Sequence, residues 1–246
     1  MTEDTTPATA AAEPGSADPR TPPRLRDDLR RGVRAVLPLA AAVFPFGIVY
    51  GAVVVDSSFD DVLGFIASFV VFAGAAQLAL VELLDQGAPW TIALATALVI
   101  NLRHVMYSGA LAPAFSEFPR RWRIPLAHLM TDQASVTSLL YFEREPDTTR
   151  RLRFYTGAGL TFFATWTISS GLGILLGATI PAELQLGFAI PLMFLSLLVP
   201  SVRDRPGFVA AAVAFAVTIL AQDAPLNTGL LIGAGAGVAF GMLARR

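Results

Sequence analysis

The sequence predicts an all-α, polytopic integral membrane protein with about seven or eight apolar segments. Hydrophobic residues make up 54% of the 246 residues and charged residues only 15%, whereas an average globular domain has about 25% charged residues. The charges gather in an N-terminal tail and in short connections between apolar runs. Several of those runs reach the roughly 20 residues that a helix needs to cross a bilayer. We therefore expect a lipid bilayer around most of the chain.

The composition excludes several kinds of site. The sequence has no cysteine and two histidines, so it offers no disulfide, no thiolate chemistry and no histidine-rich metal site. It contains no HExxH motif, EF-hand, nucleophile elbow or P-loop. We therefore expect no metal, no cofactor and no enzymatic activity, and any transport should be secondary or powered by another chain. A net charge of -1 gives no reason to expect binding of nucleic acid.

Residues 1–32 are expected to form a disordered cytoplasmic tail, and residues 33–246 a single transmembrane domain. The tail is rich in alanine, proline, threonine and charge, without apolar periodicity, and it lacks the features of a secretory signal peptide. An arginine cluster directly precedes the first apolar run, which predicts a cytoplasmic N-terminus in a bacterial inner membrane. This cluster consists of Arg24, Arg26, Arg30, Arg31 and Arg34.

Eight apolar segments follow the tail. The first three and the fifth are long enough to span a bilayer, whereas the sixth and seventh, with 15 and 16 residues, are expected to be partial or broken helices. The segments are Ala35–Val55, Val62–Leu84, Pro89–Pro113, Ile124–Phe142, Phe154–Thr179, Leu186–Pro200, Gly207–Gln222 and Leu226–Leu243.

The arginines do not fit eight plain crossings. The other arginine-rich connections would fall inside the cell, as the positive-inside rule requires, but Arg120, Arg121 and Arg123 would fall outside. Either that loop is an exception or the segments around it do not cross fully. Ile124–Phe142 is polar enough to form a re-entrant or broken helix, which is tolerated where it lines a cavity.

Proline and glycine interrupt the first segment, at Pro45, Gly47 and Gly51. A proline in a helix interior removes a backbone hydrogen bond and kinks the chain. Breaks near the midplane are how secondary transporters expose backbone groups to a substrate. These positions therefore predict either a helix break of that kind or simple packing, because proline and glycine are frequent in membrane helices.

The least lipid-like stretch is the polar run from Asn101 to Ser108. On a helix Asn101, His104 and Ser108 share one face, and Arg103 and Tyr107 form a neighbouring stripe. Ionisable residues at membrane depth are costly and usually face a protein interior or a water-filled path. We predict that these five residues line such a path. The alternative for Arg103 is a place near a helix end, from which it snorkels to a headgroup.

Two further polar positions are candidates for the same path. Gln77 is surrounded by small residues, and it serves either as a substrate contact or as an interhelical hydrogen bond. His128 and Asp132 are one helical turn apart, and a carboxylate beside an imidazole favours the charged ring. That pair is either a proton relay or a static pair that satisfies two buried groups.

A glycine recurs every four residues in the last segment, at Gly229, Gly233, Gly237 and Gly241. These glycines form one stripe on a helix, and such a stripe lets another helix approach closely. The favoured partner is the preceding segment, Gly207–Gln222, because consecutive helices are usually neighbours. The alternative partner is a second subunit.

Five motifs occur in order after the tail. They are Phe44–Gly51, Val71–Gln77, Asn101–His104 with Tyr107 and Ser108, Thr131 with Asp132, and Phe188–Leu192. Together they resemble the AzlC family, the large subunits of bacterial branched-chain amino-acid exporters. The resemblance implies efflux of valine, leucine, isoleucine and methionine, with a small hydrophobic AzlD-type membrane subunit as partner. Gln133 stands where we expect an acidic residue in many members, which removes one candidate for proton coupling.

The expected function is thus that of a secondary exporter subunit. By charge, Asn101, Arg103 and His104 would bind the carboxylate of the amino acid and Asp132 its ammonium group. One rival is an intramembrane enzyme that uses His128 and Asp132 as an acid–base pair, although no nucleophile or metal site accompanies them. The other is an assembly or sensor subunit that does not transport.

Overall fold

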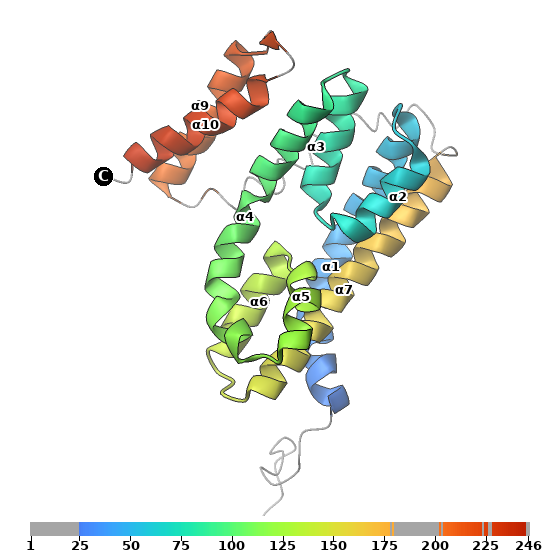
Figure 1. Ribbon diagram of the computed structural model, residues 1–246, viewed down its shortest axis with the longest axis vertical. Helices are drawn as coiled ribbons and strands as arrows, with labels where there is room; N and C mark the ends of the chain where they lie inside the picture. Colours follow the sequence, from blue (N-terminus) through green and yellow to red (C-terminus); the bar gives the residue numbers. More distant parts are fainter. Residues whose placement is uncertain are drawn as a thin grey trace, which may run out of the picture.

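A computed structural model describes residues 25–177, 179, 202, 204–222, 224–225 and 228–244. The elements in that part of the chain are all α-helices (Figure 1). Within it, three helices are long and apolar enough to cross a membrane: α1 (Leu25–Asp56), α4 (Trp90–Glu117) and α7 (Thr148–Gly177). The all-α membrane class is confirmed, but the structure does not confirm seven or eight spanning segments. The sixth expected segment, Leu186–Pro200, lies outside the described residues.

The helix α1 begins at Leu25 and runs unbroken to Asp56. The expected tail of residues 1–32 is therefore too long at its C-terminal end. The break expected at Pro45, Gly47 and Gly51 is also wrong, because all three lie inside this continuous helix. The loss of one backbone hydrogen bond at a proline is offset by packing against α7 along the whole length of the bundle (Figure 1).

The contact between α1 and α7 is close enough to require small residues. A Cβ atom on Gly51 would overlap the carbonyl oxygen of Ser170, and one on Gly173 would overlap the carbonyl oxygen of Ile48. The glycines of α1 therefore serve packing, the simpler of the two interpretations. At the start of both helices, Asp28 is 1% exposed and lies between Arg150 and Arg153, at N–O distances of 3.8 and 3.4 Å.

The second expected segment is not one span but a hairpin of two short helices, α2 (Asp61–Val70) and α3 (Gly74–Asp85). The chain reverses at Phe72, whose φ of 44° lies in the left-handed region that bulky residues rarely adopt. The end of α3 returns to the start of α2, because the Ser58 N–H donates to the Asp85 carboxylate at 2.9 Å. The hairpin thus enters and leaves at the same end of the bundle.

The fourth expected segment is a second hairpin, made of α5 (Arg120–His128) and α6 (Asp132–Phe142). Both of its outer ends lie where α4 ends and α7 begins. Arg123 donates to the carbonyl oxygens of Phe118 and Ser116, and Arg151 donates to that of Phe142 at 3.1 Å. This hairpin therefore enters from the end opposite to the first one (Figure 1).

The two hairpins make the core an inverted repeat. Each unit consists of one long helix followed by a broken hairpin: α1 with α2 and α3, then α4 with α5 and α6. The short helices have 10 and 12 residues in the first unit and 9 and 11 in the second. Their tips meet inside the bundle, where the His128 ring donates to the Phe69 carbonyl at 2.8 Å. Repeats of this kind, with broken helices at the repeat interface, are typical of secondary transporters.

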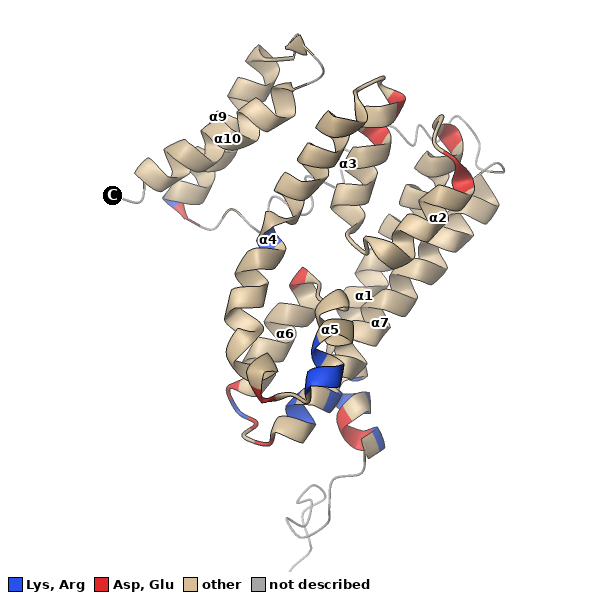
Figure 2. Ribbon diagram, viewed as in Figure 1, with Lys and Arg blue, Asp and Glu red and all other residues tan. Residues whose placement is uncertain are grey.

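With this topology, the arginines between α4 and α5 no longer conflict with the positive-inside rule. Figure 2 shows most of the basic residues, with some acidic ones among them, at the end of the bundle where α1, α5 and α7 begin, which we call the arginine end. Arg120, Arg121 and Arg123 lie there because α5 starts where α4 finishes. Acidic residues mark the other end, the acidic end, namely Asp56, Asp60, Asp61, Glu82 and Asp85. Of the two interpretations of that loop, incomplete crossing is therefore correct.

The helices α9 (Arg205–Leu220) and α10 (Gly229–Leu243) form a separate hairpin beside α4 (Figure 1). The four glycines of the stripe are the buried residues of α10, and they face α9. A Cβ on Gly237 would lie 2.7 Å from the Ala210 carbonyl oxygen, and one on Gly233 would lie 2.8 Å from that of Ala214. The stripe is thus an internal seam, as the favoured interpretation predicted.

Cysteine labelling tests the two hairpins. The chain has no cysteine, so single cysteines at exposed Arg121 and Glu143 should react with an impermeant maleimide from one face of the membrane. Cysteines at Ser58 and Gln86 should react from the other face. Labelling of Arg121→Cys and Glu143→Cys from opposite faces would show that α5 and α6 form one crossing.

The glycine seam predicts a contrast between two leucine substitutions on α10. Gly237→Leu should destabilise the protein by about 1–3 kcal/mol, the usual cost of overpacking, because the side chain meets α9. Gly235→Leu is the matched control, since nothing lies within 4 Å of a Cβ at that position. Tryptophan-fluorescence melting in detergent measures both; equal melting temperatures would contradict the seam.

Candidate functional site

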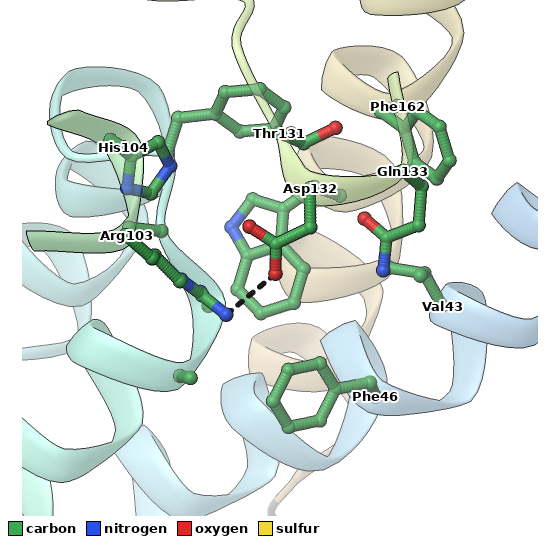
Figure 3. A pocket seen from close by; sticks show the side chains of 13 residues that line it. Val43, Phe46, Arg103, His104, Thr131, Asp132, Gln133 and Phe162 are labelled. Carbon is green, nitrogen blue, oxygen red and sulfur yellow. Dashed lines mark hydrogen bonds and ion pairs between the residues drawn. The ribbon is translucent and has the colours of Figure 1, made fainter. Parts of the chain in front are cut away.

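A cavity of about 80 Å³ lies where the two hairpin tips meet (Figure 3). Its walls are formed by α1, α4 and α7 and by the starts of α3 and α6. The first hairpin contributes Phe72–Ala75 and the second Thr131–Gln133. The remaining lining residues are Val43, Phe46, Arg103, His104, Phe162 and Trp166.

An ion pair crosses the cavity. Arg103 Nη1 of α4 lies 2.6 Å from Asp132 Oδ2 at the start of α6, and both side chains point into the opening (Figure 3). The two side chains are 31% and 27% exposed, so neither is in bulk water nor fully desolvated. Arg103 therefore does not snorkel to a headgroup; its charge is balanced at the centre of the bundle.

The other walls are apolar and aromatic. Trp166 is 3% exposed, with its ring centroid 5.5 Å from that of Phe46 and 5.4 Å from that of Tyr50. Phe72, at the reversal of the first hairpin, packs edge-on against Phe163 at 5.2 Å. A ligand in the cavity would therefore meet both signs of charge on one side and aromatic carbon on the other.

Of the eight predicted path residues, Arg103, His104 and Asp132 line this cavity. Asn101 lies one helical turn before His104 in α4. Its backbone carbonyl accepts a hydrogen bond from the His104 ring at 3.3 Å. Gln77 is buried behind the tip of α3, where its side-chain oxygen accepts from the Ala73 N–H at 3.1 Å. Here the structure favours a structural hydrogen bond over a direct ligand contact.

Tyr107 and Ser108 lie further along α4, beyond the cavity. Tyr107 packs against a second apolar cluster that includes Leu111 and Phe118. Ser108 is exposed, with its hydroxyl 3.7 Å from the Met130 sulfur. Both residues follow the helical stripes that the sequence predicted, but the lining of the cavity does not reach them.

His128 and Asp132 do not form the expected pair. The prediction assumed one continuous helix, but α5 ends at His128 and α6 begins at Asp132. The His128 ring instead bonds the Phe69 carbonyl of the opposite hairpin, and Asp132 bonds Arg103. The break in the chain separates the two groups, so neither a relay between them nor a shared acid–base role fits this geometry.

Trp166 and Phe162 also line the cavity, although they are not among the residues predicted from the sequence. One signal was present in the sequence. Tryptophan in membrane helices is enriched at the interfaces, whereas Trp166 lies in the middle of the fifth apolar segment. A tryptophan at that depth indicates a packed or ligand-facing ring.

Comparison with known proteins agrees with the motif pattern. The family model described as AzlC protein matches residues 38–180, which contain the whole inverted repeat apart from the start of α1. The chain belongs to the AzlC family. This is a transport-related family rather than an enzymatic one.

Relatives of this AzlC chain are membrane proteins from distant organisms. An uncharacterised membrane protein of Archaeoglobus fulgidus is 29% identical over 78% of this chain and 83% of its own length. Inner membrane protein YgaZ of Escherichia coli is 24% identical over 82% of this chain and 86% of its own. An uncharacterised membrane protein of Helicobacter pylori is 26% identical over 61% of the chain and 65% of its own. No solved structure matches the chain significantly.

The central ion pair predicts a measurable coupling energy. Asp132→Asn and Arg103→Gln should each cost about 1–3 kcal/mol, less than the ~3–5 kcal/mol for breaking a fully buried pair, because both side chains are partly exposed. The double variant should cost less than the sum of the two. Melting in detergent measures all three, with exposed Glu143→Gln as control; additive costs would show that the two charges do not interact.

Proposed function

We propose that this AzlC protein is the large subunit of a secondary exporter of branched-chain amino acids. The observation that carries the proposal is the central cavity, which combines charges of both signs with an aromatic wall. A zwitterion with an apolar side chain has the complementary chemistry: two opposite charges on one carbon and an aliphatic group beside them. Family membership supports transport, and the implied substrates are valine, leucine, isoleucine and methionine.

The inverted repeat supports a transport mechanism over a static role. Broken helices that meet at the interface between inverted repeats are where secondary transporters bind their substrates. The cavity is smaller than the ~300–1,000 Å³ of typical ligand pockets, so we expect the hairpin tips to separate when substrate enters. In this arrangement movement of one hairpin against the other would open the cavity to alternate ends of the bundle.

Orientation and partner complete the proposal. The arginine end is expected to face the cytoplasm, because short arginine-rich connections are retained there. Export would then carry the amino acid from the arginine end to the acidic end of the bundle in the bacterial inner membrane. The proposed partner is a small AzlD-type membrane subunit, with no nucleic acid or cofactor involved. The rival acid–base enzyme loses its basis, since His128 and Asp132 are not paired.

Efflux from vesicles tests the proposal. The purified chain, with and without its small partner, is reconstituted in liposomes loaded with radiolabelled leucine, with and without a pH gradient. Leucine should leave faster than from protein-free liposomes, and Asp132→Asn should slow efflux at least about tenfold by removing the anion that holds the ammonium group. Labelled lysine is the control for leakage. Efflux no faster than the control under any condition would refute the exporter proposal.

A further inference from the structure

The helix α3 begins inside the cavity without a cap. Its first residues, Gly74 and Ala75, line the cavity, and no side chain caps its start. The first N–H groups of a helix have no intrahelical acceptor. Among the described residues, none accepts from the Gly74 or Ala75 N–H. In the part of the chain that the structure describes, the one side-chain bond at this end is donated by the Ala73 N–H to the Gln77 side-chain oxygen.

The second hairpin tip differs in charge. The helix α6 starts with Asp132 in its first turn and is capped by Thr131, whose hydroxyl accepts from the Ala134 N–H at 3.2 Å. An acid at a helix start offsets the partial positive charge of the exposed N–H groups. The first turn of α3 has no acid. Of the two helix starts that meet at the cavity, the start of α3 is the one whose charge is left unbalanced.

A second, independent donor without a partner belongs to a residue that lines the same cavity. Trp166 lines the cavity and is 3% exposed, yet its indole Nε1–H has no acceptor among the described residues. The benzene edge of the ring packs on the tip of α3, since a Cβ on Gly74 would be 2.5 Å from Cη2 and 2.8 Å from Cζ3. A buried donor without an acceptor is destabilising, and a ligand oxygen would satisfy it.

The cavity also has a hydrogen-bond acceptor without a partner, on Asp132. Asp132 holds Arg103 through Oδ2, while its Oδ1 is buried and without a partner. When the hairpin tips separate and expose Oδ1, an ammonium group could therefore bind it while the ion pair stays intact. A carboxylate on Arg103, by contrast, would compete with Asp132 for the guanidinium group that Asp132 already engages at 2.6 Å.

We propose that the carboxylate of the transported amino acid binds the Gly74 and Ala75 N–H groups at the start of α3, with Trp166 Nε1–H as a further donor. The ammonium group then binds Asp132 Oδ1, and Arg103 positions Asp132 without binding the substrate. This inference rests on the proposed function and refines it, because it moves the carboxylate from Arg103, Asn101 and His104 to the backbone of the broken helix. Helix N-termini are established carboxylate and phosphate sites.

Removal of a single N–H group tests the subsite. Replacing the Ala75 amide by an ester deletes that donor without adding bulk, and Ala75→Pro does the same at a helix position where proline is tolerated. Leucine binding to the purified protein should weaken about 10- to 100-fold, the range for a hydrogen bond to a charged group. Leucinamide lacks the carboxylate, so the Ala75 variants should bind it with the same affinity as the unmodified protein does. Calorimetry with each compound gives the ratio of the two affinities.

Two controls separate the possible explanations. Val62→Pro, or the ester at Val62, makes the same change at the second residue of α2, where Val62 is exposed on the outside of the bundle, and should leave both affinities unchanged. Arg103→Gln should keep the preference for leucine over leucinamide. If Arg103→Gln abolishes that preference while both Ala75 variants retain it, the carboxylate binds Arg103 and the inference is wrong. Absence of leucine binding by the unmodified protein would instead overturn the proposed function itself.

Discussion

Two helix breaks at the centre of the bundle impose the strictest requirement on this fold. A broken helix in a bilayer must have its backbone groups satisfied by protein, because hydrocarbon offers no hydrogen bonds. Gln77 accepts from the Ala73 N–H, His128 donates to the Phe69 carbonyl, and Thr131 caps α6. Each of these bonds satisfies a backbone group that a helix break leaves without an intrahelical partner. At the cavity, the Trp166 Nε1–H and Asp132 Oδ1 remain without a partner among the described residues.

A rigid pair of helices supports these breaks. The helices α1 and α7 pack so closely that Gly51 and Gly173 touch backbone atoms across the contact, and buried Asp28 ties their first turns together through Arg150 and Arg153. Such close contacts tolerate little movement. The hairpins have fewer contacts with one another than α1 and α7 have. Movement between the two repeats is therefore easier at the hairpin tips than within the α1–α7 pair.

The inverted repeat also decides the electrostatics of the centre. Because the hairpins enter from opposite ends, the starts of α3 and α6 converge and bring two partial positive charges to one place. Asp132 balances one of them and is itself held by Arg103. A cavity with this balance suits a ligand that carries its own anion and cation, since each charge then finds an opposite one. The aromatic wall formed by Phe46, Phe72 and Trp166 suits an apolar side chain.

The class of protein, its family and three polar residues of its centre, Arg103, His104 and Asp132, could be predicted from the amino-acid sequence. Composition and apolar length predict helices in a bilayer, because burying backbone there requires them. The isolated charges Arg103 and Asp132 stand out, because charge at membrane depth is costly. That these two charges bind one another could not be predicted, because they are 29 residues apart in the chain and meet only in the folded bundle. Helical periodicity assumes an unbroken helix, so it paired His128 with Asp132. The possible break at Pro45 came from proline chemistry instead, and packing of α1 against α7 keeps that helix continuous. The breaks at Phe72 and before Asp132 depend on contacts between hairpins that are distant in the sequence, and no local pattern encodes those contacts.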